Sequence, residues 1–332
     1  MFFVATAVCS AQSTLSRIKA ANNLSCGLNR EEAEYSNLDA HGNRAALDVD
    51  LCKAVAVSIL GSGAHFTITP YSDENSSMEA LSKGVVDLVP TARPTLMNAA
   101  VRKLKFSRTI LFDPQALLVN TAMGIRTPHD LAGKKICFLV ETDIELNLWA
   151  YMTRENIAFL PFPFQEEGEM EAAFITGNCA AITADTTQLG YERISFRGMA
   201  KNFEILPANL ANDPLALATR TDDPLFSSLV DQVANVLIKA EESGLTQSNI
   251  DAQSKLRKLH PDPDTDLLLG ITAGVGKPFG LDDHWPVHVV GAVGNYGEIF
   301  SRDLGPGSPM RLARAQNRLS SDGGLLISTP VR

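Results

Sequence analysis

The sequence predicts an α/β protein built from two doubly wound α/β domains that are joined by two crossing hinge segments. Strand and helix patterns alternate along the chain, which is typical of parallel sheets covered by helices on both faces. The length of 332 residues exceeds one ordinary hydrophobic core and suits two domains of this class. Two extended apolar segments, at residues 117–119 and 214–218, separate the two rounds of alternation.

The first round has a βαβαβ order after a short amphipathic helix at residues 14–21. Its expected strands and helices, in chain order, are 24–28, 48–60, 65–70, 76–83 and 85–89. In the second round we expect, in chain order, a helix at 128–132, a strand at 135–140, a helix at 144–155, a strand at 159–164, a helix at 167–176 and a strand at 180–184. A long amphipathic helix at 226–240 then returns to the first domain.

The two crossing segments predict how the chain is divided. Residues 14–119 and 216–332 form a discontinuous first domain, and residues 120–215 form an inserted second domain. Residues 1–13 form a signal-like segment, because residues 1–11 are apolar and end in small side chains. This segment is too short to span a bilayer and lacks a basic region, so we expect an incomplete export signal. A frayed apolar terminus of a cytosolic protein is the alternative.

Composition excludes several classes of function. The apolar content of 45% with 20% charged residues is typical of a soluble globular protein. A net charge of −9 disfavours nucleic acid and anionic lipid as partners, because both require a basic surface.

Four of the five cysteines, Cys26, Cys52, Cys137 and Cys179, fall two in each predicted domain, and Cys9 lies in the signal-like segment. This distribution predicts one disulfide within each domain, which favours an exported protein. Four reduced core thiols are the alternative. No metal site is predicted, since the chain has no C-x-x-C pair and no histidine near these cysteines.

Three motifs carry a resemblance to a known family. Residues 47–52 read LDVDLC after Asp39 and Gly42, residues 137–148 read CFLVETDIELNL, and residues 293–300 read VGNYGEIF. The chain resembles type II periplasmic solute-binding proteins, in particular the general L-amino-acid-binding receptors of ABC transporters. The resemblance implies a monomeric periplasmic receptor without a cofactor or enzymatic activity, which closes its domains around a small solute and presents it to membrane permease subunits.

The resemblance also implies where the ligand binds. In the family, an Arg in a T-L-S-R motif and the hydroxyls of a G-T-T turn hold the ligand's carboxylate, and an Asp holds its ammonium. Asp185 matches that Asp, although an N-cap role for the next helix is equally expected. Tyr35 matches an aromatic wall of the site, with a core aromatic as the alternative. The carboxylate-binding positions differ, because T-L-S-R becomes Thr95-Leu96-Met97-Asn98 and G-T-T becomes Glu141-Thr142-Asp143.

Arg93 stands close enough to replace the missing guanidinium, or it is a surface arginine. Arg102 is expected on the surface, and Asp143 is expected to stabilise a helix start. The cleft has an acidic lining if the side chains of Glu31, Glu32, Glu34 and Glu74 point inward. By family the ligand is an L-amino acid, whereas by residues it is a cationic or amine solute. A paralogue that binds no small ligand and an acid-base lyase on the same fold are the alternatives.

Overall fold

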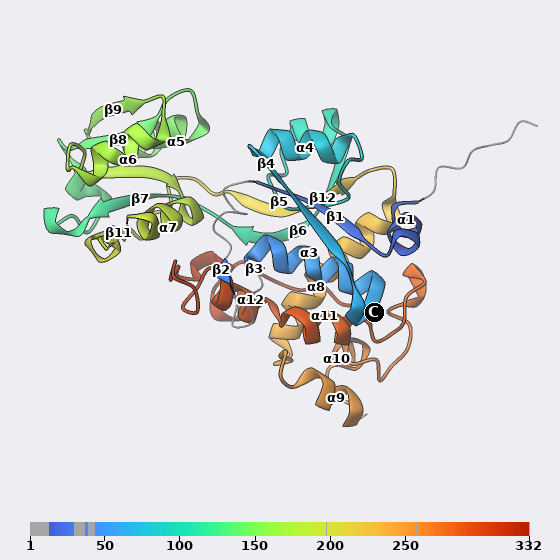
Figure 1. Cartoon of the computed structure of the whole chain (residues 1–332). Coiled ribbons are helices and arrows are strands. Elements are labelled where there is room, and N and C mark those ends of the chain that lie inside the picture. The colour runs from blue at the N-terminus through green and yellow to red at the C-terminus, as the bar shows by residue number, and fades with distance from the viewer. Residues whose placement is uncertain (1–12, 30–36, 39–43, 197, 257, 332) are drawn as a thin grey trace, which may run out of the picture.

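The computed structural model describes residues 13–29, 37–38, 44–196, 198–256 and 258–331, and Figure 1 shows two groups of strands, each covered by helices. The predicted signal-like segment lies almost entirely outside the described residues. Among the helices of the described part, none combines the length and the apolar character that crossing a lipid bilayer would require.

The first domain contains a sheet in two parts. Strands β1 and β4 pair in parallel, and β12 pairs antiparallel with both β5 and β6. A parallel bridge between Cys26 and Leu88 connects the two parts. The strands are β1 (Leu24–Asn29), β4 (Phe66–Tyr71), β5 (Val89–Ala92), β6 (Leu104–Phe112) and β12 (Pro214–Arg220), with a small hairpin of β2 (Asn37–Leu38) and β3 (Arg44–Ala45).

Helices cover both faces of this sheet. Helix α4 lies on one face, and α3, α8, α11 and α12 pack together on the other (Figure 1). They share one apolar core with β1, in which Leu51, Val233 and Val290 are fully buried. The helices are α1 (Thr14–Ala21), α3 (Leu47–Leu60), α4 (Glu74–Ser82), α8 (Pro224–Glu242), α9 (Ile250–Leu256), α10 (Pro263–Leu268), α11 (Trp285–Val293) and α12 (Tyr296–Asp303).

The second domain contains one five-stranded sheet in the order β11-β7-β10-β8-β9. Helix α5 packs on one face, and α6 and α7 pack on the other. The elements are β7 (Gln115–Asn120), β8 (Lys135–Leu139), α5 (Asp143–Arg154), β9 (Leu160–Phe164), α6 (Glu167–Ile175), β10 (Ala181–Asp185), α7 (Thr186–Ser195) and β11 (Phe203–Ile205).

Short helical turns complete the chain. A π-helical turn, η2, spans Met97–Val101 beside the junction of the domains. The 3-10 turns are η1 (Gly61–Gly63), η3 (Thr121–Met123), η4 (Pro128–Leu131), η5 (Ala200–Asn202), η6 (Lys277–Phe279), η7 (Ala315–Asn317) and η8 (Ser320–Asp322).

The first crossing lies nearer the N-terminus than the sequence predicts. Residues 117–119 are not a connecting segment, because they lie within β7 and pair with β10 and β11. Leu117 and Val119 face the core beneath α5, while Ala116 and Leu118 face the core beneath α6 and α7. A strand buried on both faces has no polar alternation, which explains why it resembles a linker. Residues 214–218, the second predicted connection, likewise lie within a strand, β12, which pairs with β5 and β6.

The backbone crosses between the sheets at Asp113 and Asp213. These two segments are held together, since the N–H of Asp113 donates to the carbonyl of Asp213 at 2.9 Å and the N–H of Gln115 donates to that of Ala211 at 3.1 Å. Both crossings therefore run side by side as a two-stranded connection, which is suited to a hinge.

The strand predicted at residues 85–89 is also displaced, since β5 begins at Val89. The side chain of Asp87 accepts hydrogen bonds from the N–H and the hydroxyl of Ser25, and the positive φ of Gly84 turns the chain just before it. Asp87 and Leu88 still pair with β1 through their backbone, since the N–H of Asp87 donates to the carbonyl of Ser25 at 2.8 Å and the N–H of Gly27 donates to that of Leu88 at 2.9 Å. Other predicted elements agree with the structure to within a few residues at each end.

Both predicted disulfides are confirmed. Cys26–Cys52 joins β1 to α3 with 6.4 Å between Cα atoms, and Cys137–Cys179 joins β8 to the turn before β10 with 5.9 Å. Each bridge links elements packed on the same sheet. The four half-cystines are buried at 2% exposure or less.

Candidate functional site

Arg93 lies between the two domains and contacts three carboxylates. Its Nη1 donates to Glu74 Oε2 at 2.5 Å, its Nη2 donates to Asp185 Oδ2 at 2.5 Å, and its Nε donates to Asp213. Its backbone N–H also donates to Glu74 Oε1 at 3.0 Å. One guanidinium thus connects α4 of the first domain, β10 of the second and the second crossing segment.

Local structure places each of these groups at the junction. Arg93 follows the last residue of β5, and Asp185 is the last residue of β10, so both lie at the carboxyl ends of their strands. Ligand sites of α/β sheets occur at such ends. Glu74 is the first residue of α4, whose N-cap Asp73 accepts from the N–H of Ser76 at 2.8 Å.

These residues line two neighbouring cavities. The outer cavity has a volume of about 720 Å³ and is bounded by α4, η2, α5 and the second crossing. The inner cavity, of about 220 Å³, is bounded by α4, β5 and α7. Glu74, Arg93 and Asp185 line both cavities and form the partition between them.

Charges at the partition alter one another's ionisation. Burial alone would lower the pKa of the Arg93 guanidinium, but the charges of Asp185, Asp213 and Glu74 together raise it. Burial raises the pKa of the Asp185 carboxyl to about 6, and the charges of Asp213 and Glu74 add to this while Arg93 opposes it. Asp185 therefore titrates near neutral pH, as groups at functional sites often do.

Two further aspartates lie at the crossings. Burial, with the charge of Asp185, raises the pKa of Asp113 to about 7 against two hydrogen bonds from Thr187 that lower it. The N–H of Thr187 donates to Asp113 at 3.0 Å. Burial also raises the pKa of Asp213, although the Arg93 charge opposes this. Asp113, Asp185 and Asp213 make the junction of the domains strongly acidic. Arg93 contacts Asp185 and Asp213 among these three.

Asn98, which replaces the arginine of the family motif, supports Arg93. Its Nδ2 donates to the carbonyl of Arg93 at 3.0 Å, and its N–H donates to Thr95 Oγ1 at 3.1 Å. Both Thr95 and Asn98 line the outer cavity. Arg102, predicted on the surface, also lines this cavity and donates to Asn98 Oδ1 at 2.5 Å.

Only one of the three predicted site residues in the turn before α5 lines the outer cavity. Asp143, in the first turn of α5, lines the outer cavity, whereas Glu141 and Thr142 do not. The hydroxyl of Thr142 donates to the carbonyl of Leu139 and accepts from the N–H of Glu145, so it caps the helix. Glu141 stands where the family motif has glycine, and its backbone is left-handed, with φ of 61°.

Asp185 is the N-cap residue of α7, yet its side chain makes no capping hydrogen bond within the described residues. It is directed at Arg93 instead. Glu74 points into the junction, as the acidic-lining hypothesis requires. Tyr35, Glu31, Glu32 and Glu34 lie outside the described residues.

Sequence reasoning missed Asp113 and Asp213 as cavity residues. Each precedes a proline in a crossing segment, and X-Pro favours extended backbone. That pattern indicates a connection but does not indicate which way an acidic side chain points. The signal appears only when the two crossings are placed side by side.

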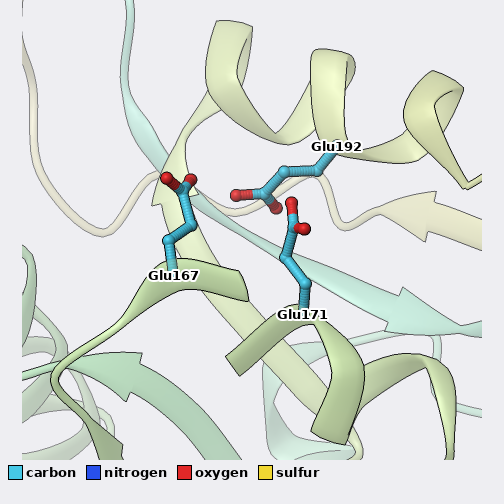
Figure 2. Close-up of side chains that lie close together, drawn as sticks. All are labelled: Glu167, Glu171 and Glu192. Atoms are coloured by element: carbon cyan, nitrogen blue, oxygen red, sulfur yellow. The ribbon is translucent and has the colours of Figure 1, made fainter. Parts of the chain in front are cut away.

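A second group of carboxylates lies in the second domain, apart from Glu74, Arg93 and Asp185. Figure 2 shows Glu167 and Glu171 on α6 pointing toward Glu192 on α7, and their oxygens lie within 4.8 Å of one another. The side-chain amide of Gln188 donates to Glu167 at 2.5 Å. A cluster of acids alone does not select a cation, so we assign no metal site to it.

Comparison with known proteins decides the family. The general L-amino acid-binding periplasmic protein AapJ of Rhizobium johnstonii is 34% identical over 322 residues, covering 96% of this chain and 93% of the relative. The chain belongs to the periplasmic amino-acid-binding proteins of ABC transporters. The glutamate/glutamine/aspartate/asparagine-binding protein BztA of Rhodobacter capsulatus is 30% identical, covering 96% of this chain and 94% of the relative.

A solved structure supports the same assignment for this periplasmic binding protein. A periplasmic binding protein from Brucella ovis with glutathione bound matches with a TM-score of 0.81 and 33% identity, covering 97% of this chain and all of that one. No family model matches the chain. The type II periplasmic binding fold and its relation to amino-acid transporters, both expected from the motifs, are confirmed.

Proposed function

We propose that this protein is the substrate-binding component of an ABC transporter for an amine-bearing, cationic solute. The solute enters the outer cavity, the two domains close on it by bending at the Asp113 and Asp213 crossings, and the closed form meets the permease. The periplasmic relatives support the same location for this chain, and we expect it to act as a monomer.

The observation that carries the proposal is that three carboxylates already neutralise Arg93. A guanidinium that binds a ligand's carboxylate must give up part of this pairing, which leaves partly buried acids without a partner. Such a loss is costly, because an unpaired charge in a dry site loses its solvation.

An ammonium group has the opposite effect. It can take the place of Arg93 beside Asp185, whose side chain is 18% exposed, while Arg93 keeps its contacts with Glu74 and Asp213. Charge-assisted hydrogen bonds of this kind are stronger than neutral ones. Adding a positive charge to an acidic cavity is therefore favourable, whereas adding a carboxylate is not.

The relatives bind other solutes, and their ligands define the competing hypotheses. AapJ and BztA are amino-acid-binding proteins, and the Brucella ovis protein has glutathione bound. Arg102 supports these ligands, since its guanidinium lies on the outer cavity and is hydrogen-bonded there to neutral partners, Asn98 and Asn75. For a carboxylate-bearing solute to bind, Arg102 would have to provide the recognition that Arg93 does not.

A thermal-shift screen at low salt separates these hypotheses. The panel contains 1-aminobutane, linear diamines, the common L-amino acids and glutathione. A ligand that binds the native state stabilises it by about 2.7 kcal/mol at a hundredfold excess over its dissociation constant. We expect shifts with the amines and with no carboxylate ligand. Shifts with amino acids or glutathione alone would contradict the amine proposal and favour the specificity of the relatives.

Two other outcomes test the remaining alternatives. No shift across the panel would favour a paralogue that acts as a sensor or partner protein. Conversion of a ligand into product would favour a lyase, in which Asp185 or Asp113 would act as the acid or base. Stoichiometric binding without product is the result that we expect.

A further inference from the structure

The inner cavity is a second space that Arg93 lines. It has a volume of about 220 Å³, and both domains contribute to its wall through Ser77 of α4, Thr91 of β5 and Gln188 of α7. That volume is several times the roughly 30 Å³ that one water molecule occupies in the liquid. The chamber therefore has room for part of a solute.

Among the described residues, three side chains line both this chamber and the outer cavity. Glu74, Arg93 and Asp185 line both spaces, and the two ion pairs that join them each have an N–O distance of 2.5 Å. If an incoming ammonium takes the place of the Arg93 guanidinium beside Asp185, the partition opens. A solute bound at Asp185 then reaches both cavities.

The inner chamber offers acceptors for positive charge. Asp113 lines it and is 4% exposed, and each of its oxygens accepts one hydrogen bond from Thr187, which leaves a further lone pair on each. Thr91 also lines it, and its buried Oγ1 makes no hydrogen bond within the described residues. A buried polar atom of this kind indicates a missing partner.

Part of the wall is suited to an alkyl chain. Val89 and Leu215, on neighbouring strands, line the chamber. A chain of methylene groups gains about 0.8 kcal/mol for each group that is buried against such a surface. The chamber thus combines a buried carboxyl group, a hydroxyl and two apolar side chains.

We propose that the inner chamber is a second cation subsite and that the solute is a linear diamine or polyamine. One ammonium group binds at Asp185 in the partition, the methylene chain lies against Val89 and Leu215, and the second ammonium binds Asp113 and Thr91. This inference rests on the proposed amine specificity and goes further, because it states the length and the charge of the solute.

Isothermal titration calorimetry with a length series tests the subsite. The series contains 1-aminobutane and the α,ω-diamines with three to eight methylene groups. We expect at least one diamine to bind about tenfold more tightly than the monoamine, with an optimum at one length, because a second charge-assisted contact forms at a fixed distance. Affinity that is equal for monoamine and diamines, or that changes steadily with length, would overturn the subsite and leave the amine proposal standing.

Variants locate the second contact. Asp113→Asn and the nearly isosteric Thr91→Val are each expected to reduce the ratio of diamine to monoamine affinity by about fivefold or more. Glu169→Gln, an equal loss of charge on the exposed face of α6, is the matched control and should leave the ratio unchanged. If Thr91→Val and Asp113→Asn both fold, as judged by circular dichroism, and both keep the wild-type ratio, the subsite is wrong. If no amine binds the wild-type protein, the proposed function fails together with it.

Discussion

Arg93 of the first domain and Asp185 of the second form an ion pair across the interdomain cavity, with 2.5 Å between Nη2 and Oδ2. The family motifs assign the two ends of a bound amino acid to an arginine and an aspartate. Here these two residue types contact each other directly, and Glu74 and Asp213 add further negative charge. The positive charge of Arg93 is thus already balanced by carboxylates of the protein, and the site as a whole is acidic.

Arg93 is expected to stabilise the fold by neutralising these acids. Replacing it with glutamine, Arg93→Gln, leaves Glu74, Asp185 and Asp213 close together without their shared cation. We expect the free energy of unfolding to fall by about 1–2 kcal/mol, less than for a fully buried pair because the Arg93 side chain is 39% exposed. Urea unfolding at pH 7, followed by circular dichroism, measures this.

The matched control for this substitution is Arg154→Gln. Arg154 forms a surface pair with Glu155 at 3.2 Å, so its loss should change stability by less than about 0.5 kcal/mol. Equal effects of the two substitutions would show that Arg93 is an ordinary surface arginine.

Amine binding should depend on pH through Asp185. Its carboxyl has a pKa of about 6, raised mainly by burial, so its negative charge is present above that pH and is lost below it. An ammonium ligand requires the charged form, and we therefore expect affinity to fall as the pH drops from 7 to 5. Titration calorimetry at several pH values measures the trend. Asp185→Asn should bind weakly and lose the change in affinity near pH 6, and any pH dependence that remains should come from Asp113, whose pKa burial raises to about 7. A variant that keeps the wild-type profile would exclude Asp185 as the partner.

Restoring the family arginine should reverse the preference of the site. Asn98→Arg adds one positive charge to the wall of the outer cavity, which Asn98 lines at 4% exposure. We expect amine affinity to fall and L-amino-acid affinity to rise, each by about fivefold or more, because one charge at close range changes the free energy by about 1 kcal/mol. Asn98→Gln, which adds no charge, is the control. A gain in amino-acid affinity with glutamine as well would mean that charge is not the cause.

Glu141 is expected to reduce stability through its backbone. Its φ of 61° lies in the left-handed region, where side chains other than glycine cost about 1 kcal/mol. Glu141→Gly should raise the free energy of unfolding by about that amount. At Glu155, with φ of −83°, the same change should lower it. Equal signs at the two positions would contradict this explanation.

Much of the fold follows from the sequence, because alternating strand and helix patterns are local signals and because two predicted domains each contain a pair of cysteines. The errors have a common cause. Residues 117–119 form a strand that is buried on both faces, and residues 85–88 follow the positive φ of Gly84 and make a single bridge to β1, so neither segment shows the period of an ordinary strand.

The site was predictable only in part. Asp185 and Arg93 were found through their places in family motifs, but their mutual ion pair depends on how the two domains meet. Asp213 and Asp113 lie at crossings, and no sequence pattern fixes the direction of a loop side chain. Glu141 and Thr142 occupy positions of the family's G-T-T turn, yet neither of them lines the outer cavity.

The most direct test of the account is the affinity of the purified, oxidised protein for 1,4-diaminobutane and for L-amino acids, measured by titration calorimetry at low salt. We predict one-to-one binding of the diamine, a loss of about tenfold or more in Asp185→Asn, and no heat with amino acids. Tight binding of an L-amino acid without binding of the diamine would contradict the central claim, because the cavity would then recognise a carboxylate despite its acidic lining.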